Sequence, residues 1–523
     1  PVVNRIEGTL WLRSTGTLNA PGILSAGRFV DDGGTLNGNV ITDDSLITTR
    51  WLNPAGGNWS VATNWSAGLP DPTRIAVVDL AGDYAITLDT SATVAELRFG
   101  ATAGTQTLAI GGASLQLIGA GHFRTNTVLR LAGGTFGGIA EIVLDGTLTW
   151  TSGTISGSGS LTLNPACHTS IEGGGGKVLR RTVDNWGTVV WSGGNIDARE
   201  AVVNNRAGGV WELAGDQYFD DGVFNNQGTL VKTAGAADNQ STFRNLNASG
   251  GQFHNSGLVE LQAGRLLLGV SGTHSGSFVL ATNTTVTFAS GTHALAEGCG
   301  FGGLGTVRFQ TPIQLGTDVN FGTLNIVFED SATLSGNYLL SNSPGGTITF
   351  AKSMTIPGSM TIAGTLSLAD SSLTVTISGT FTLEPTGVLN NPGTLRAGAF
   401  VDNGGTIVGN EPVTIGLGST GFCIDEIRIE RSAMSTASAR PGASWTFRVT
   451  LTWRAEDTHG VVIETSRDLR NWFEQSAVVR EVAPGSFEAT LDAPADTSCY
   501  FRIKCPAGPT VFPDSVLPPP APY

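Results

Sequence analysis

The chain has 523 residues and a formal net charge of −14, an acidic balance that argues against binding to nucleic acid or to an anionic membrane surface. Charged residues make up 14% and hydrophobic residues 40% of the chain, so a core can form and a disordered chain is excluded. The 72 glycines favour many short strands joined by tight turns, and no apolar run is long enough to span a bilayer.

Residues 1–50 are predicted to be terminal solenoid coils of an upstream repeat, or a docking segment, followed by a linker. Residues 8–39 align without gaps on residues 379–410, so the same solenoid end occurs twice, 371 residues apart. Either the native protein is a tandem array, or the N-terminal coil docks head to tail on the solenoid end of another subunit. Open sheet edges must be capped or paired, and a head-to-tail contact that does not close builds a fibre.

Residues 51–100 are predicted to open a new solenoid unit, and they are rich in tryptophan. Trp51, Trp59 and Trp65 lie close together in the sequence. A solenoid must cover the exposed end of its core, so these side chains are expected to form a cap. The alternative is that they stack on sugar rings as a glycan-binding face.

Residues 101–410 are predicted to form the main solenoid. A turn glycine followed by threonine and an aliphatic residue recurs, and each occurrence indicates a short alternating strand that buries one face. Stacking many such strands in a coil buries a continuous core, as in a parallel β-helix. The phrase begins at Gly8, Gly146, Gly228, Gly305, Gly322, Gly346 and Gly364.

Four asparagines mark the coil length in the middle of the chain. Asn185, Asn205 and Asn226 begin variants of one phrase and are spaced by 20 and 21 residues, a reasonable length for one coil, and Asn255 begins a fourth variant. Asparagines at the same turn of successive coils can stack their amides into a ladder. We expect a structural role for all four.

The C-terminal part differs in composition from the solenoid. Residues 411–421 are predicted to be a linker, and residues 422–510 hold well-alternated, charge-bearing strands, about seven in all, which suggest a small β-sandwich. Residues 511–523 form a proline-rich tail that should be extended polyproline II.

The five cysteines contain no CxxC pair, so a zinc site is not expected. In an exported protein, Cys423 with Cys499 or Cys505 would tie the ends of the C-terminal domain together. Cys167 and Cys299 fit better as small buried hydrophobic residues.

Several phrases resemble a known group of proteins. The Asn-Trp-Ser phrases of residues 56–70 and the segment 224–232 resemble the large secreted repeat proteins of bacteria with autotransporter-like or adhesin-like β-helices. Residues 463–472 and 499–503 resemble the fibronectin-type-III-like modules that close such proteins. The resemblance implies export and an extracellular or cell-surface role, and it supplies no catalytic residues.

Parallel β-helices also host polysaccharide lyases and hydrolases, which need paired carboxylates or a base beside a stabilising cation. The best group for such a site comprises Asp216, Asp220 and Asp221 beside Tyr218, with Asp184, Arg180 and Arg181 one to two coils upstream and able to line the same face. Asp221-Gly222 is an ordinary turn dipeptide, however, which favours a structural reading. The histidines show no metal-ligand spacing: His122, His168, His254, His274, His293 and His459.

The sequence therefore predicts an all-β chain, a right-handed parallel β-helix (β-solenoid) followed by a small Ig-like or fibronectin-III-like β-sandwich. We expect a secreted or cell-surface structural protein, not an enzyme, with no catalytic residues, metal or cofactor. Its expected partner is a further copy of itself, in a head-to-tail filament. The alternatives are a glycan-binding adhesin and a polysaccharide-degrading β-helix enzyme.

Overall fold

The computed structural model describes residues 3–31, 33–42, 46–235, 239–246 and 250–415, together with the backbone of seven strands between 423 and 504. The described residues are almost entirely β-structure, with no α-helix and one 3-10 turn at Ala62–Asn64. Over this same part of the chain there is accordingly no helix of the length and apolarity that a membrane crossing requires. The expectation of a nearly all-β chain with a parallel solenoid is confirmed.

The first element is a small parallel sheet. Strands β1 (Val3–Leu12), β2 (Thr17–Asp31) and β3 (Thr35–Thr42) pair in the order β1-β2-β3. Each strand lies one layer beyond the last, as successive coils of a solenoid do.

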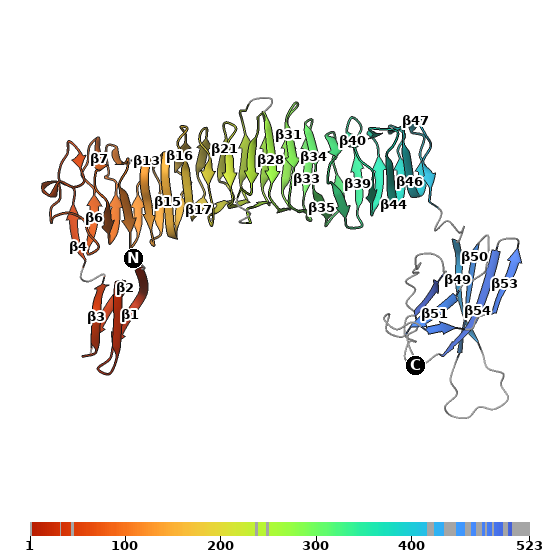
Figure 1. The fold of residues 1–523 in the computed structure, drawn as a ribbon, viewed down its shortest axis with the longest axis horizontal. Helices are drawn as coiled ribbons and strands as arrows, with labels where there is room; N and C mark the ends of the chain where they lie inside the picture. Colours follow the sequence, from red (N-terminus) through yellow and green to blue (C-terminus); the bar gives the residue numbers. More distant parts are fainter. Residues whose placement is uncertain are drawn as a thin grey trace. The chain divides into compact units, whose positions relative to one another are not determined.

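From Ile47 onward the chain winds into about 18 stacked coils (Figure 1). Each full coil contributes strands to three columns, and within a column nearly all strands pair in parallel with the strand one coil away. Five long strands continue from one column into the next: β13 (Thr127–Gly138), β15 (Thr147–Leu163), β17 (Lys177–Asn185), β44 (Thr374–Leu383) and β46 (Thr394–Asp402).

The remaining strands of the first column include those that carry Asn205, Asn226 and Asn255, whereas Asn185 ends β17. They are β4 (Ile47–Arg50), β6 (Arg74–Val78), β9 (Glu96–Phe99), β12 (Gly121–Phe123), β14 (Ile142–Leu144), β20 (Val202–Asn205), β23 (Val223–Asn226), β26 (Gln252–Asn255), β29 (Gly272–His274), β32 (His293–Leu295), β35 (Pro312–Leu315), β38 (Thr333–Ser335), β41 (Met354–Ile356) and β48 (Val413–Thr414).

The second column follows the first in each coil. Its strands are β5 (Gly57–Asn58), β7 (Tyr84–Leu88), β10 (Gln106–Ile110), β16 (His168–Ile171), β18 (Thr188–Trp191), β21 (Val210–Leu213), β24 (Thr229–Lys232), β27 (Leu258–Leu261), β30 (Ser277–Leu280), β33 (Gly300–Gly303), β36 (Val319–Asn320), β39 (Leu339–Asn342) and β42 (Ser359–Ile362).

The third column carries Asp220, at the end of β22. Its strands are β8 (Ala92–Val94), β11 (Ser114–Leu117), β19 (Ile196–Asp197), β22 (Tyr218–Asp220), β25 (Ser241–Arg244), β28 (Arg265–Gly269), β31 (Thr285–Phe288), β34 (Thr306–Phe309), β37 (Asn325–Phe328), β40 (Thr347–Phe350), β43 (Thr365–Leu368), β45 (Val388–Asn391) and β47 (Thr406–Gly409).

The core lies inside the coils because alternate side chains of each strand point inward. Identical residues stack on one another there: Phe288, Phe309, Phe328 and Phe350 form a run with ring centroids 5.1, 5.1 and 5.3 Å apart. These distances follow the strand spacing of roughly 4.8 Å. The repeat of the backbone therefore sets the repeat of the core.

The C-terminal strands belong to a second compact unit and pair antiparallel. One sheet has the order β49 (Cys423–Ser432), β50 (Thr446–Arg454), β54 (Ser486–Pro494), β53 (Val478–Ala483), and the other has the order β52 (Phe473–Gln475), β51 (Val462–Ser466), β55 (Tyr500–Lys504). The tail 511–523 lies outside the described residues.

Candidate functional site

Asn185, Asn205, Asn226 and Asn255 end successive strands of the first column and form a ladder inside the core, called here the asparagine ladder. Each residue is at most 1% exposed. The Nδ2 of each of the first three donates to the Oδ1 of the next over 2.8 Å. Asn226 and Asn255 are 29 residues apart in sequence but occupy adjacent coils.

Each of the four amide nitrogens donates to a backbone carbonyl oxygen. The four acceptors, at 2.9 to 3.2 Å, are the oxygens of Val210, Thr229, Leu258 and Ser277. Buried polar groups need such partners, and these amides meet that need while joining neighbouring turns. Asn342 and Asn391, which the sequence analysis did not single out, are also buried, and their amides bond the carbonyls of Thr365 and Asn410.

The three tryptophans of the first coils pack against one another. Trp51, Trp59 and Trp65 are 1%, 1% and 3% exposed. Trp65 meets Trp51 and Trp59 edge to face, with ring centroids 5.1 and 4.8 Å apart. Rings so covered offer no exposed face on which a sugar could stack.

The acidic group suggested by the sequence is divided among separate partners. Asp216 pairs with Lys232, with 2.9 Å between Oδ1 and Nζ. Asp220 accepts from Nε of Arg244 at 2.6 Å. The Oδ1 of Asp221 accepts the backbone N–H of Leu246 at 2.8 Å, and Asp221 has a φ of 65°, as a turn residue does.

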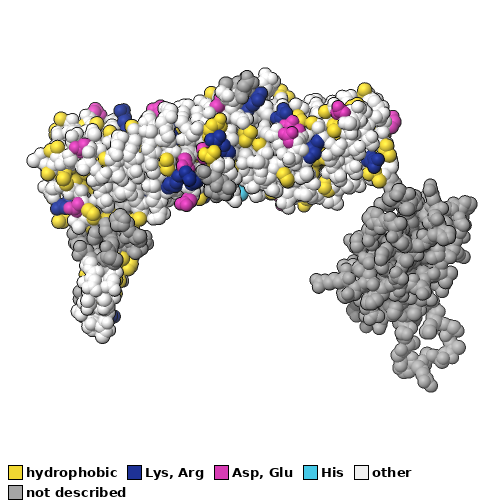
Figure 2. All heavy atoms as spheres, viewed as in Figure 1, with side chains coloured by type: hydrophobic (Ala, Val, Ile, Leu, Met, Phe, Trp, Pro, Cys, Tyr) yellow, Lys and Arg dark blue, Asp and Glu magenta, His cyan; other side chains and the backbone are white. Residues whose placement is uncertain are grey.

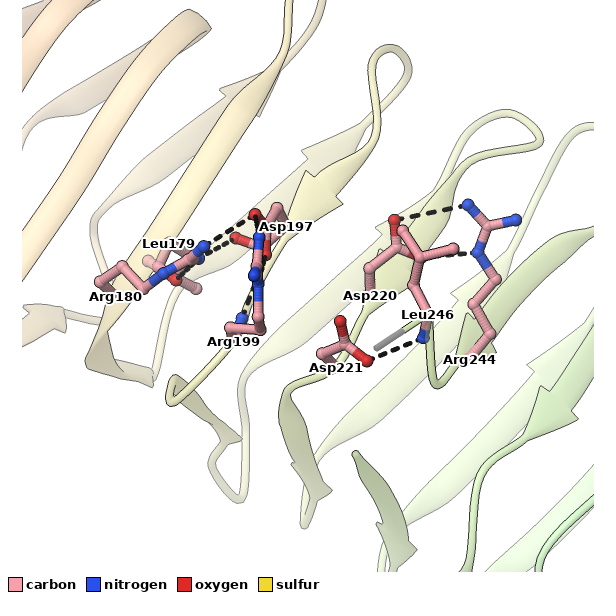
Figure 3. A network of polar contacts seen from close by, with 8 residues as sticks. All are labelled: Leu179, Arg180, Asp197, Arg199, Asp220, Asp221, Arg244 and Leu246. Carbon is pink, nitrogen blue, oxygen red and sulfur yellow. Dashed lines mark hydrogen bonds and ion pairs between the residues drawn. The ribbon is translucent and has the colours of Figure 1, made fainter. Parts of the chain in front are cut away.

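Ion pairs on the outer face of the third column form the polar network of Figure 3. Asp197 binds Arg180 over 2.7 Å and Arg199 over 2.9 Å, and the two guanidinium groups approach its carboxylate from different directions. Further along the same column, the guanidinium of Arg244 on β25 lies 3.8 Å from the ring centroid of Tyr218 on β22.

The network favours the ionised form of Asp197. Hydrogen bonds from Arg199, with support from Arg180, hold the pKa of Asp197 far below its usual range. A general acid working near neutral pH needs a raised pKa instead. In Figure 2, charged side chains on the visible face are few, and basic and acidic groups are mixed where they gather. Charges that are few and lie beside opposite charges are more typical of a surface with ion pairs than of a binding site for a charged ligand.

Arg180 and Arg181 do not line the same face, contrary to the expectation, because adjacent residues of a strand point to opposite sides. Arg180 is on the outside with Asp197, whereas Arg181 is 2% exposed and points inward. Its guanidinium donates to the carbonyl oxygens of Ala140, Ser156 and Ser160. Asp184 lies on the outside of the first column, where it binds Arg206.

Lys232 is a further buried cation that sequence reasoning missed. Its side chain is fully buried, and its Nζ donates to the oxygens of Gly215, Asp216 and Ser241 at 2.8, 2.9 and 3.0 Å. Burial lowers the pKa of Lys232, while Asp216 opposes the shift. A lysine of lowered pKa can activate a serine, but here Ser241 is 2% exposed and donates to Gly215 O, so both groups hold the turn.

A pair of histidines interrupts the aromatic core. The Nε2 of His274 lies 2.9 Å from the Nδ1 of His293, the rings are stacked, and both residues are 0% exposed. Phe288 packs edge to face on both rings. Burial lowers the pKa of His274 well below its usual value and that of His293 to about 4.

This pair should make the solenoid sensitive to acid. Between pH 6.5 and 4 the unfolded chain binds a proton at His293 that the folded chain excludes, so stability falls as pH falls through this window. The loss from His293 alone is about 1.4 kcal/mol per pH unit, or about 3 kcal/mol over the window. We expect the His274→Leu/His293→Leu variant to lose less stability than the parent between these pH values in urea denaturation.

The exposed His168 offers a matched control, because its replacement removes a histidine without touching the core. The His168→Asn variant should keep the parental pH profile. Equal pH dependence in the parent and in the double variant would contradict the assignment to the buried pair.

The described cysteines are unpaired: Cys167 is buried and Cys299 is partly buried, and burial raises their pKa values to about 11 and about 12. Such thiols are unreactive. The side chains of Cys423, Cys499 and Cys505 lie outside the described residues. Where side chains are described, no three His, Cys, Asp or Glu gather as a metal site would require.

Comparison of the chain with known proteins finds no matching family model, no matching curated protein and no matching solved structure.

Proposed function

We propose that the chain is a structural protein of the bacterial cell surface or extracellular space, in which the solenoid serves as a stiff rod. One observation carries this proposal: a single stack of about 18 coils runs from Ile47 to the last strands of the solenoid, and the buried amides of the asparagine ladder are hydrogen-bonded between its coils. A body of this kind opens locally only with difficulty, because its backbone hydrogen bonds run from coil to coil and few long loops leave it.

The two other classes receive less support from the described side chains. A glycan-binding adhesin that used the tryptophans would need exposed rings, and those rings are buried. A polysaccharide-degrading enzyme would need convergent carboxylates, and Asp216, Asp220 and Asp221 have separate partners. The antiparallel pairing of β49–β55 supports the further proposal that a small Ig-like or fibronectin-III-like sandwich follows the rod.

Electron microscopy of the purified chain, with limited proteolysis, tests the structural role. We expect straight rods about 85 Å long, from about 18 coils at roughly 4.8 Å each. A protease-resistant fragment spanning the solenoid should accumulate. Bent or collapsed particles and rapid digestion of the coils would contradict a stiff rod. Release of reducing or unsaturated sugars from a panel of polysaccharides would favour the enzyme.

A further inference from the structure

The sequence repeat of residues 8–39 is also a repeat of backbone structure. Residues 17 to 20 of β2 pair with residues 35 to 38 of β3, and residues 388 to 391 of β45 pair with residues 406 to 409 of β47. Both registers coincide when 371 is added to the N-terminal numbers. The N–H of Thr35 bonds Gly16 O over 2.9 Å, and that of Thr406 bonds Gly387 O over the same distance.

The turns repeat as well. Gly33 and Gly404 are equivalent and have φ values of 89° and 98°, which favour glycine. A Cβ on Gly34 would lie 2.4 Å from Cγ of Leu12, and one on Gly405 would lie 2.5 Å from Cγ of Leu383. Leu12 and Leu383 are both buried. Residues 3–31 and 33–42 therefore fold as terminal solenoid coils.

Both copies of this end have an open edge. Within the third column, Ile348, Leu366 and Leu389 stack directly and are each 0% exposed. Ile407 is next in the column and is only partly buried, as is Leu18 of the N-terminal sheet. Among the described strands, β47 pairs only with β45, and residues 17 to 20 of β2 pair only with β3. Ile407 and Leu18 therefore each lack a further coil that would cover the side chain.

The N-terminal coils cannot reach the far end of their own solenoid. Only residues 43–45 separate β3 from residue 46, and the step from residue 42 to residue 46 spans at most about 14 Å. The first and last coils of the stack are about 80 Å apart. A second copy of the chain is thus the occupant that can bring N-terminal coils to β47.

We propose that β47 at the end of one solenoid pairs in parallel with residues 17 to 20 of β2 in a second copy, joining chains head to tail. Leu18 then continues the column of Ile348, Leu366, Leu389 and Ile407, and Asn19 lies directly beyond Val408 on the outer face. This is the coil-on-coil contact that the solenoid already repeats throughout its length. Because the contact does not close, it extends into a fibre. This proposal rests on the proposed structural role, and its partner is a second copy of the chain.

A disulfide cross-link between copies tests the register. Asn19 is exposed and Val408 is 54% exposed, so cysteine at each position leaves the core intact. Stacked residues of neighbouring parallel strands lie about 4.8 Å apart, within the Cα–Cα range of a disulfide. We expect mild oxidation of the full-length Asn19→Cys/Val408→Cys variant to give a ladder of covalent multimers on non-reducing gels.

Val279 gives a matched control, because it is 40% exposed but lies in the middle of the stack. The Asn19→Cys/Val279→Cys variant, and the parent with its own five cysteines, should give no ladder. Multimers in the control at the level of the Asn19→Cys/Val408→Cys variant, or none in that variant, would overturn the proposal. A parent chain that sediments as a single species at all concentrations would also overturn it. Rods seen singly in the microscope would leave the structural role standing, so the two failures are distinguishable.

Discussion

Replacement of Arg181 by methionine is expected to lower the free energy of unfolding by about 3 kcal/mol. The guanidinium donates to three carbonyl oxygens, and burial lowers the pKa of Arg181 to about 10. Three charge-assisted hydrogen bonds contribute roughly 1.5 to 3 kcal/mol each. Their sum exceeds the free-energy cost of desolvation that the lowered pKa reflects, which is about 3 kcal/mol. Methionine fills much of the volume but removes the donor that Arg181 supplies to the carbonyls of Ala140, Ser156 and Ser160. Urea denaturation followed by circular dichroism measures the loss.

The adjacent Arg180 is the matched control for this variant. It is partly exposed, and its partner Asp197 keeps Arg199 when Arg180 is removed. Arg180→Met should therefore cost no more than about 1 kcal/mol, as surface ion pairs do. Similar losses for the two variants would show that the inward position of Arg181 is energetically unimportant.

The two arginines also show what sequence reasoning reaches in this fold. Strand alternation predicts that neighbours point to opposite faces, but the sequence does not say which one points inward. A charged side chain is expected to point outward. Arg181 and Lys232 point inward because carbonyl oxygens from other coils accept their hydrogen bonds. Those partners are up to 41 residues away in sequence and become neighbours only when the coils stack.

The stack of coils can be predicted from the sequence because similar phrases recur once per coil at a short spacing. Spacings of 20 and 21 residues place Asn185, Asn205 and Asn226 at one turn, and each later pairs with the next. The 29-residue step to Asn255 does not break the ladder, because β26 pairs with β23 in register and places Asn255 beside Asn226. The histidine pair carries no such signal, since His274 and His293 occupy different positions of their strands.

The asparagine ladder should be as sensitive as the buried arginine. Asn205 accepts from Asn185 and donates to Asn226 and to Thr229 O, all within 3.0 Å. Asn205→Leu removes three buried hydrogen bonds and leaves polar groups on both sides unpaired, so we expect a loss of roughly 3 to 4 kcal/mol in urea denaturation. Amide hydrogen exchange should accelerate most in the coils that contain these partners, because the ladder joins neighbouring turns.

Asn204 separates the effect of the buried ladder from that of losing an amide. It precedes Asn205 in the same strand but points outward, where its Nδ2 donates to Asp184 at 2.9 Å and its Oδ1 accepts from Asn225 at 2.8 Å. Water can replace these partners, so Asn204→Leu should cost no more than about 1 kcal/mol. If both variants lost the same free energy of unfolding, the buried amide of Asn205 would contribute no more to stability than the outward amide of Asn204. A large difference, with faster exchange confined to the Asn205 variant, would place the stiffness of the rod in its interior polar ladder.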